Sequence, residues 1–315
     1  MGERTLRLAF FGTPEFAVPT LEHLLAGPHL VVGVVSQPDR RRGRGRRLSP
    51  SPVSEVALTA GLPLLRPEQV ADAESELRAL EPDLGVVVAF GQFIPKRIRE
   101  LPKLGYCING HASMLPRWRG AAPMQHAILT GDATTGVSVM RVAREMDAGA
   151  WLLQRTLEIG ADETAGELAV RMAALTADAI AEGVAAIAAG AAADAWTEQD
   201  PAGVTLAPKI TRDDARIDWS GSAAALARHV RAMAPSPGAS TRLDDEPLRI
   251  LGATVEAGEA DRAPGTVRND RASPLAVATG AGWLVPSRLQ RAGGKPLPVA
   301  EFLRGRALPD GTRLG

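Results

Sequence analysis

The chain has 315 residues, which is long for one domain and sufficient for two that each bury a core. Its 32 glycines and 24 prolines stay below the share that signals disorder, and its formal net charge is zero, so a folded protein is indicated. No apolar run approaches the roughly 18 residues that span a bilayer, and the N-terminal MGERTLRLAFFG passes directly into a strand. We therefore expect no membrane partner and a cytoplasmic location.

The first half of the chain alternates between apolar strands and helical segments. Residues 6–11, 16–25 and 30–36 predict a strand, a helix and a strand that form a right-handed β-α-β unit. The first turn holds a single glycine, so the dinucleotide fingerprint G-x-G-x-x-G is absent. The alternation continues through helix 52–60, strand 62–65, helix 73–80, strand 84–90, strand 106–109, helix 122–129 and strand 136–140. An α/β domain with a Rossmann-like, mostly parallel sheet is therefore predicted.

A cluster of arginines follows the second predicted strand. Its members are Arg40, Arg41, Arg42, Arg44, Arg46 and Arg47, interrupted only by two glycines. Guanidinium groups at this density suit contacts with phosphates and bases. An arginine run also occurs as a plain solvated or disordered loop, so both interpretations stay open at this point.

The composition changes after a long predicted helix over residues 164–188. Thr164 and Glu167 have the capping-box spacing at its start, and the Ala/Gly-rich residues 188–195 end it. We place the first domain at residues 1–189, a linker at 190–206 and a second domain at 207–315.

The second domain is predicted to hold one helix and several short strands. These elements are helix 222–233 and strands 248–251, 265–267, 275–278 and 283–285. Short strands at this spacing are typical of a small OB-like β-barrel. Residues 206–315 carry 16 Lys and Arg against 12 Asp and Glu, so this part of the chain is net positive.

The stretch CINGHASMLPRWRGAAPMQ, residues 107–125, carries the candidate chemistry. If the strand that begins near residue 106 continues, its period of two places Asn109 and His111 on one face. An amide offers fixed N–H donors and an imidazole can be charged or neutral near pH 7, so the pair suits a carbonyl oxygen that becomes an oxyanion. The site would lie between a strand end and a helix start, where open parallel sheets bind ligands.

Cys107 is the single cysteine of the chain, which excludes an internal disulfide and a Cys-based metal cluster. A lone cysteine beside this site could be a nucleophile. We expect instead a small apolar residue in a buried strand, because no activating partner is evident.

The run NGHASMLPRWRGAAP, residues 109–123, closely resembles the signature of the 10-formyltetrahydrofolate-dependent formyltransferases. In that family an Asn, a His two residues later and a downstream Asp in a D-x-G turn form the catalytic set, and Asn109, His111 and Asp147 occupy those places here. From spacing alone, Asp147 would be an ordinary turn residue. The family's L-D-T-G-D reads MDAGA at residues 146–150, so a second carboxylate of the family pattern is missing.

The resemblance implies transfer of a formyl group from N10 of 10-formyltetrahydrofolate to a primary amine, without a metal. The amine would attack the formyl carbon, and the amide of Asn109 with protonated His111 would stabilise the tetrahedral oxyanion. Asp147 would favour the imidazolium and help to relay the amine proton.

The resemblance also implies a folate site lined by the segment that follows His111. The family's S-L-L-P segment corresponds here to Ser113, Met114, Leu115 and Pro116, with a methionine replacing a leucine of similar volume. Phe90, at the end of the central predicted strand, is expected either to form another wall of this site or to pack in the core.

The resemblance extends from residue 6 to about residue 303 and favours initiator methionyl-tRNA as the acceptor. The arginine cluster resembles the loop with which such family members contact the acceptor stem, and KITRDDARIDWS, residues 209–220, resembles the family's start of its barrel domain. Two alternatives stay open: a formyltransferase acting on an amino sugar or on glycinamide ribonucleotide, and a catalytically silent RNA-binding protein. We expect a monomer.

Overall fold

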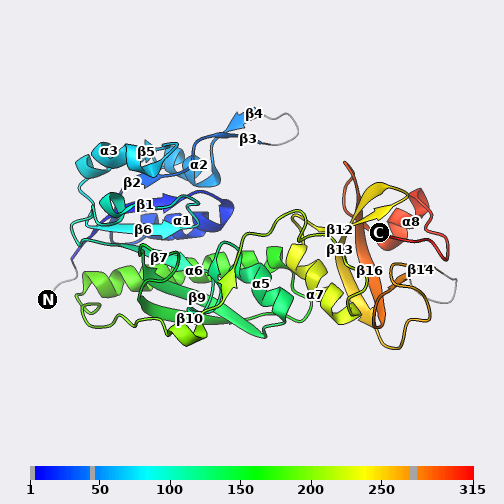
Figure 1. Cartoon of the computed structure of the whole chain (residues 1–315). Helices are drawn as coiled ribbons and strands as arrows, with labels where there is room; N and C mark the ends of the chain where they lie inside the picture. Colours follow the sequence, from blue (N-terminus) through cyan, green and yellow to red (C-terminus); the bar gives the residue numbers. More distant parts are fainter. Residues whose placement is uncertain (1–3, 43–46, 270–274) are drawn as a thin grey trace. The chain divides into compact units, whose positions relative to one another are not determined.

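The structure, a computed structural model of the chain, describes residues 4–42, 47–269 and 275–315 (Figure 1). The chain divides into two compact units. The N-terminal unit comprises Met1–Pro123, Thr134–Glu158 and Ala169–Ala207, and the C-terminal unit comprises Met124–Ala133, Ile159–Leu168 and Pro208–Gly315. Both units are built from segments that are discontinuous in sequence, and the domain bounds expected from composition stay a prediction. Among the described residues, no helix is long and apolar enough to cross a membrane.

The N-terminal unit contains a sheet of seven strands within the described part of the chain. In spatial order these are β10 (Trp151–Glu158), β9 (Thr134–Arg141), β7 (Cys107–His111), β6 (Leu84–Val88), β1 (Arg7–Gly12), β2 (Leu30–Val35) and β5 (Leu64–Leu65). The strands from β7 to β5 run parallel, and β9 and β10 extend the sheet with antiparallel pairing. The predicted mostly parallel α/β sheet is confirmed, whereas β10 was not predicted.

Helices lie between the strands as the alternating pattern predicts. They are η1 (Glu15–Ala17), α1 (Val18–Ala26), α2 (Pro52–Thr59), η2 (Val70–Ala73), α3 (Glu74–Ala79), α4 (Lys96–Arg99), α5 (Pro123–Thr130) and α6 (Ala165–Ala188). Ser51 caps α2 by accepting the Ser54 N–H at 3.0 Å, and Thr164 and Glu167 form the capping box at the start of α6. The capping box predicted for α6 is confirmed.

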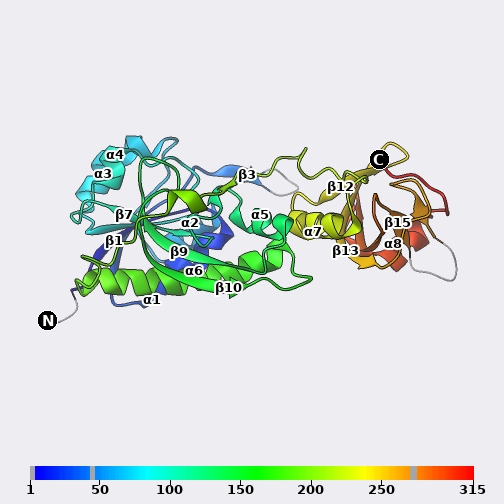
Figure 2. The same cartoon turned by 60° about the horizontal axis from the view of Figure 1, so that its bottom comes forward.

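Helices cover both faces of the sheet, with α6 on one side and α3 and α4 on the other (Figure 2). On the second face, Cys107 of β7 packs in one cluster with Leu77 of α3 and Ile98 of α4. On the first face, α6 approaches β7 so closely that a Cβ added at Gly110 would lie 2.7 Å from Cγ2 of Thr176. Side chains alternate along a strand, so the odd-numbered residues of β7 point away from α6.

Cys107 is fully buried in this cluster. Burial raises the pKa of its thiol to about 12, and this effect outweighs the opposing influences of a backbone hydrogen bond and the charge of Arg99. The thiol therefore stays protonated, and the predicted role of Cys107 as a buried apolar residue is confirmed.

Arg40–Arg42 and Arg47 of the arginine cluster lie on the two strands of a hairpin, here called the arginine hairpin. Strands β3 (Arg40–Arg42) and β4 (Arg47–Ser49) pair antiparallel, with Arg41 opposite Leu48. The sequence did not predict these two strands, whose pairing rests on backbone hydrogen bonds whatever charge the side chains carry. Arg44 and Arg46 lie outside the described residues.

The C-terminal unit holds an antiparallel sheet (Figure 1). Its strands are β12 (Ala239–Leu243), β13 (Glu246–Glu256), β16 (Trp283–Arg291), β15 (Ala276–Ala278) and β14 (Val267–Arg268), with β17 (Leu297–Pro298) paired to β16. Helix α7 (Ala223–Met233) packs its buried Val230 and Met233 against this sheet, and α8 (Val299–Gly305) follows β17. The sequence predicted a small OB-like β-barrel with one preceding helix, and the structure has an antiparallel β-sheet domain with that helix. Strand β12 and helix α8 were not predicted.

Candidate active site

Asn109 and His111 lie at the end of β7, between β6 and β9. The strand continues through His111, so both side chains project from the same face, as the sequence predicts. His111 is buried, with 6% of its surface exposed, and Asn109 is partly exposed. One fixed amide and one enclosed imidazole are thus presented at the carboxyl end of a parallel strand.

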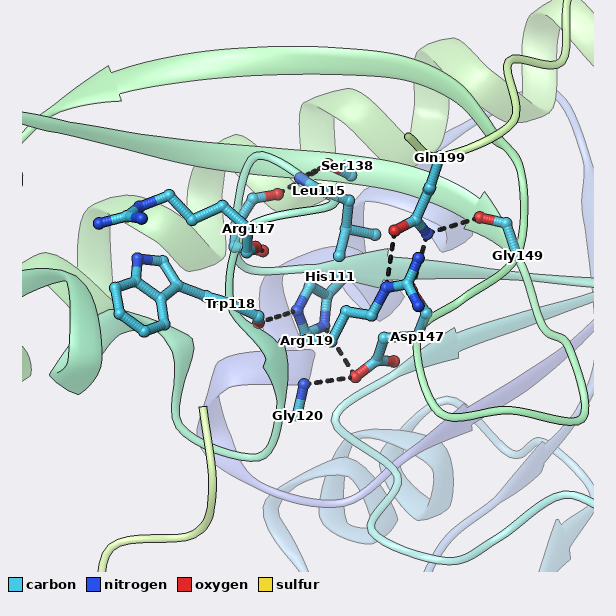
Figure 3. A network of polar contacts seen from close by, with 11 residues as sticks. His111, Leu115, Arg117, Trp118, Arg119, Gly120, Ser138, Asp147, Gly149 and Gln199 are labelled. Atoms are coloured by element: carbon cyan, nitrogen blue, oxygen red, sulfur yellow. Dashed lines mark hydrogen bonds and ion pairs between the residues drawn. The ribbon is translucent and has the colours of Figure 1, made fainter. Parts of the chain in front are cut away.

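The His111 ring faces an acceptor on each side (Figure 3). Its Nε2 lies 2.9 Å from the carbonyl oxygen of Trp118, and its Nδ1 lies 3.6 Å from Oδ2 of Asp147. Since a carbonyl can only accept, Nε2 carries a hydrogen. With Nε2 engaged by Trp118, Nδ1 is the ring nitrogen that faces the Asp147 carboxylate.

Asp147 reaches His111 from the turn between β9 and β10. Its φ of +53° lies in the left-handed region, and its Oδ2 accepts the Gly120 N–H at 2.9 Å. The second residue after it must be glycine, because a Cβ at Gly149 would collide with the carbonyl oxygen of Arg141. The glycine of the D-x-G pattern thus has a steric cause. The turn places Asp147 opposite the His111 ring, so the structure brings together the three residues that the sequence singled out, Asn109, His111 and Asp147.

Ala150 occupies the place where the family pattern has a second carboxylate. It is buried, and its carbonyl accepts the backbone N–H of Arg141 at 2.9 Å. A small apolar residue suits this enclosed position.

A segment that was predicted as part of a linker completes the site. Strand β11 (Leu206–Ala207) pairs in parallel with β8 (Arg119–Gly120), and η3 (Pro201–Gly203) precedes it. The hydroxyl oxygen of Thr205 accepts the Trp118 N–H at 2.8 Å. Gln199, at the start of this segment, donates to the backbone carbonyl of Asp147 at 2.7 Å. Sequence reasoning missed Gln199 and Thr205, because single polar residues in an irregular stretch carry no periodic signal.

The expected folate segment is tied to β9 and β10 through its backbone. Ser138 donates to the Ser113 carbonyl at 2.7 Å and accepts the Leu115 N–H at 3.0 Å, while Gln154 donates to the Leu115 carbonyl at 2.8 Å. Ser113 and Leu115 are buried. The segment therefore has a fixed backbone, held by two residues, Ser138 and Gln154, that the sequence did not single out.

The other residues assigned to the folate site differ in exposure. Met114 and Pro116 are partly exposed, so their side chains are available to a ligand. Phe90 is 2% exposed, and its ring packs edge to face against Phe11 with centroids 5.7 Å apart. Any contact of Phe90 with a ligand would have to come from its backbone, because its ring belongs to the core.

Arg40 and Arg41, in the arginine hairpin, are exposed. Arg40 donates to Oε1 of Gln37 at 2.7 Å. Over residues 4–42, 47–269 and 275–315, no group of three or more His, Cys, Asp and Glu side chains is arranged to hold a metal ion.

The fold and the site define a formyl transferase. Residues 6–184 match the family model described as formyl transferase, and residues 209–307 match the model described as formyl transferase, C-terminal domain. Among solved structures, an N-formyltransferase from Helicobacter canadensis has the same fold with a TM-score of 0.67 at 16% identity, covering 91% of this chain and 100% of that one. HypX from Aquifex aeolicus aligns with a TM-score of 0.65 at 20% identity, covering 97% of this chain and 49% of that one.

Curated relatives narrow the assignment. The chain is 46% identical to the methionyl-tRNA formyltransferase of Pseudomonas paraeruginosa over 96% of both chains. It is 44% identical to that of Halorhodospira halophila over 97% of this chain and 98% of the relative. This chain belongs to the methionyl-tRNA formyltransferase family.

Proposed function

We propose that this enzyme transfers the formyl group of 10-formyltetrahydrofolate to the amino group of methionine on initiator methionyl-tRNA. The observation that carries the proposal is the approach of the Asp147 carboxylate to Nδ1 of His111, at 3.6 Å. These two groups lie beside the strand face that presents Asn109, in a chain whose relatives bear the name of this activity.

In the proposed reaction the amine attacks the formyl carbon and the bond from that carbon to N10 breaks. The amide of Asn109 donates to the oxygen that becomes negative, and the His111 ring stabilises the same charge. In the free enzyme the Trp118 carbonyl accepts the hydrogen bond from Nε2 of that ring. In the reaction the formyl oxygen replaces this carbonyl as the acceptor. Asp147 keeps its place at Nδ1 and takes part in moving the amine proton toward the leaving nitrogen.

The segment after His111 fits the formyl donor. A pterin ring needs a flat slot with fixed backbone donors and acceptors. The backbone at Ser113 and Leu115 is held by side chains of the sheet, while the side chains of Met114 and Pro116 are accessible. A rigid backbone with partly exposed apolar side chains supports the assignment of this segment to the folate.

Three features support tRNA as the acceptor. The exposed Arg40 and Arg41 lie in a hairpin that can follow a phosphate backbone. Residues 206–315 are net positive. The curated relatives are named for methionyl-tRNA, whereas similarity to the sugar-related N-formyltransferases is below 25% identity and concerns the fold.

The test is a formyl-transfer assay with purified enzyme and 10-formyltetrahydrofolate. The acceptors are charged initiator tRNA, charged elongator tRNA and a nucleotide-linked amino sugar. We expect formylation of the initiator tRNA and none of the amino sugar. Formylation of the amino sugar alone would replace this proposal by the small-molecule alternative.

The same assay separates an enzyme from a catalytically silent RNA-binding protein. His111→Ala should bind tRNA as the wild type does and should lose turnover, because the ring acts on the reacting carbonyl. We further propose a cytoplasmic location, since the substrate is a charged tRNA. The expectation of a monomer is tested by light scattering of the free enzyme.

A further inference from the structure

Gln199 is a buried amide whose nitrogen and oxygen both make hydrogen bonds: the nitrogen to the turn that contains Asp147, and the oxygen to Arg119 (Figure 3). Its Nε2 donates to the carbonyl of Asp147 at 2.7 Å and to the carbonyl of Gly149 at 2.8 Å. Its Oε1 accepts Nε–H of Arg119 at 2.9 Å. The amide orientation is fixed by these partners, because a flipped amide would oppose two carbonyls with an oxygen.

These hydrogen bonds are part of a closed network around the carboxylate of Asp147. Arg119 holds Gln199, Gln199 holds the backbone of Asp147, and the next residue after Arg119, Gly120, holds the carboxylate through its N–H at 2.9 Å. These hydrogen bonds fix a turn in which Asp147 has a φ of +53°, a left-handed conformation that is uncommon for residues other than glycine.

The segment that carries Gln199 is itself anchored three residues earlier. The guanidinium of Arg141 lies between two aromatic rings, 4.2 Å from the centroid of Trp196 and 4.7 Å from that of Tyr106. Thr197 exchanges two backbone hydrogen bonds of 2.9 Å with Trp151 at the start of β10. The amide of Gln199 therefore starts from a backbone that is fixed on the same two strands that carry the Asp147 turn.

We propose that Gln199 is a positioning residue, which holds the Asp147 carboxylate opposite Nδ1 of His111 without touching either substrate. The inference rests on the proposed function, because it assigns Gln199 to the reaction in which Asp147 takes part. Its role is distinct from that of the predicted catalytic set, since Gln199 acts on the Asp147 backbone.

Two substitutions test this role. Gln199→Met keeps the length and most of the volume of the side chain and removes all three hydrogen bonds, while Gln199→Glu keeps the acceptor for Arg119 and removes the donors to the Asp147 turn. Both should lower kcat by roughly 10- to 100-fold, the effect of misplacing a catalytic group by about 1 Å. KM for both substrates should stay within about threefold of the wild-type value. Near-normal kcat in Gln199→Glu would overturn the proposal, because the tether to Arg119 alone would then be sufficient.

A double-mutant cycle separates positioning from simple destabilisation. In an Asp147→Asn background, Gln199→Met should reduce kcat by less than about twofold further, because the two residues act through one carboxylate. A further reduction as large as in the wild-type background would overturn the proposal. As a control, Val184→Ala truncates a fully buried side chain of α6 and should lower the melting temperature with an unchanged kcat.

Failure of this inference and failure of the proposed function give different results. If Asp147→Asn transfers formyl groups at the wild-type rate, the proposed role of Asp147 is wrong. If Asp147→Asn is slow and both Gln199 variants are as fast as the wild type, only the role of Gln199 is wrong.

Discussion

The His111 ring has an acceptor opposite each nitrogen, yet the two contacts differ in kind. The 2.9 Å distance to the Trp118 carbonyl is a hydrogen bond, whereas the 3.6 Å distance to Asp147 exceeds the usual range for one. Catalytic hydrogen bonds in a free enzyme are often long and tighten in the complex with substrate. The proposed role of Asp147 therefore requires its carboxylate to come closer to Nδ1 in the complex with substrate.

At the same scale, we expect Asn109→Ala to lower turnover about 100- to 1,000-fold, because an amide donor to an oxyanion contributes about 2.7–4 kcal/mol. The rate of formyl transfer at saturating substrates measures the effect. Asn269→Ala, which changes the other asparagine of the chain, is the matched control: it removes a 2.6 Å hydrogen bond to the Leu308 carbonyl in the C-terminal unit. A folded Asn109→Ala enzyme with normal turnover would refute the role.

The site residues were predictable where a side chain of distinctive chemistry lies in a motif that resembles the family signature. Asn109 and His111 follow from strand period and from the resemblance, and Asp147 follows from the resemblance alone. Ser138, Gln154 and Gln199 were not predictable, because their importance comes from backbone carbonyls and N–H groups that are far away in sequence. A glutamine in a polar stretch looks the same whether it contacts water or holds a catalytic turn.

Secondary structure elements were predictable where burial is continuous. β1, β2 and β6 are apolar apart from Arg7 at the start of β1, and they lie inside the sheet. β10 was missed because it is an edge strand, partly exposed along its length and interrupted by Gln154 and Arg155. The strands of the arginine hairpin were not predicted, because a run of charged residues lacks the apolar alternation that indicates a strand. Their pairing depends on backbone hydrogen bonds alone.

The arginine hairpin carries a prediction of its own. Replacing Arg40 and Arg41 by Gln should weaken tRNA binding and reduce the slope of log K against log salt by about 0.9 for each phosphate that the hairpin no longer neutralises, with an unchanged affinity for folate. Binding titrations at several salt concentrations measure the slope. The control replaces Lys96 and Arg97, which are exposed on α4. An equal change in slope in both variants would mean that general charge, rather than the hairpin, binds the tRNA.

His229 on helix α7 predicts that the C-terminal unit loses stability in mild acid. Burial lowers the pKa of His229, while a hydrogen bond to the Ala215 carbonyl and the charge of Asp214 act in the opposite direction. The unfolded chain therefore binds a proton at His229 more readily than the folded chain, so stability decreases as pH decreases below the ordinary value of 6.5.

We expect the wild type to lose more stability than His229→Gln between pH 7.5 and pH 5.5. Melting curves of both proteins at the two pH values measure the difference. Equal losses in the two proteins would show that other groups govern this range.

At the scale of the whole molecule, the formal charge of zero conceals two unlike parts. Residues 206–315 carry 16 Lys and Arg against 12 Asp and Glu, and the rest of the chain carries 20 against 24. The acidic part nevertheless contains the arginine hairpin. The positive charge proposed to contact tRNA is therefore divided between the arginine hairpin and residues 206–315, rather than spread evenly along the chain.

The enclosed thiol of Cys107 has a practical consequence for the whole chain. With its pKa raised to about 12 and its surface fully covered, it will not react with maleimides while the protein is folded. The natural sequence is therefore already a background for attaching one dye at a chosen place. A dye on a cysteine introduced for Leu48, which is 69% exposed in β4, would change its fluorescence on addition of tRNA if the arginine hairpin contacts the acceptor stem as proposed.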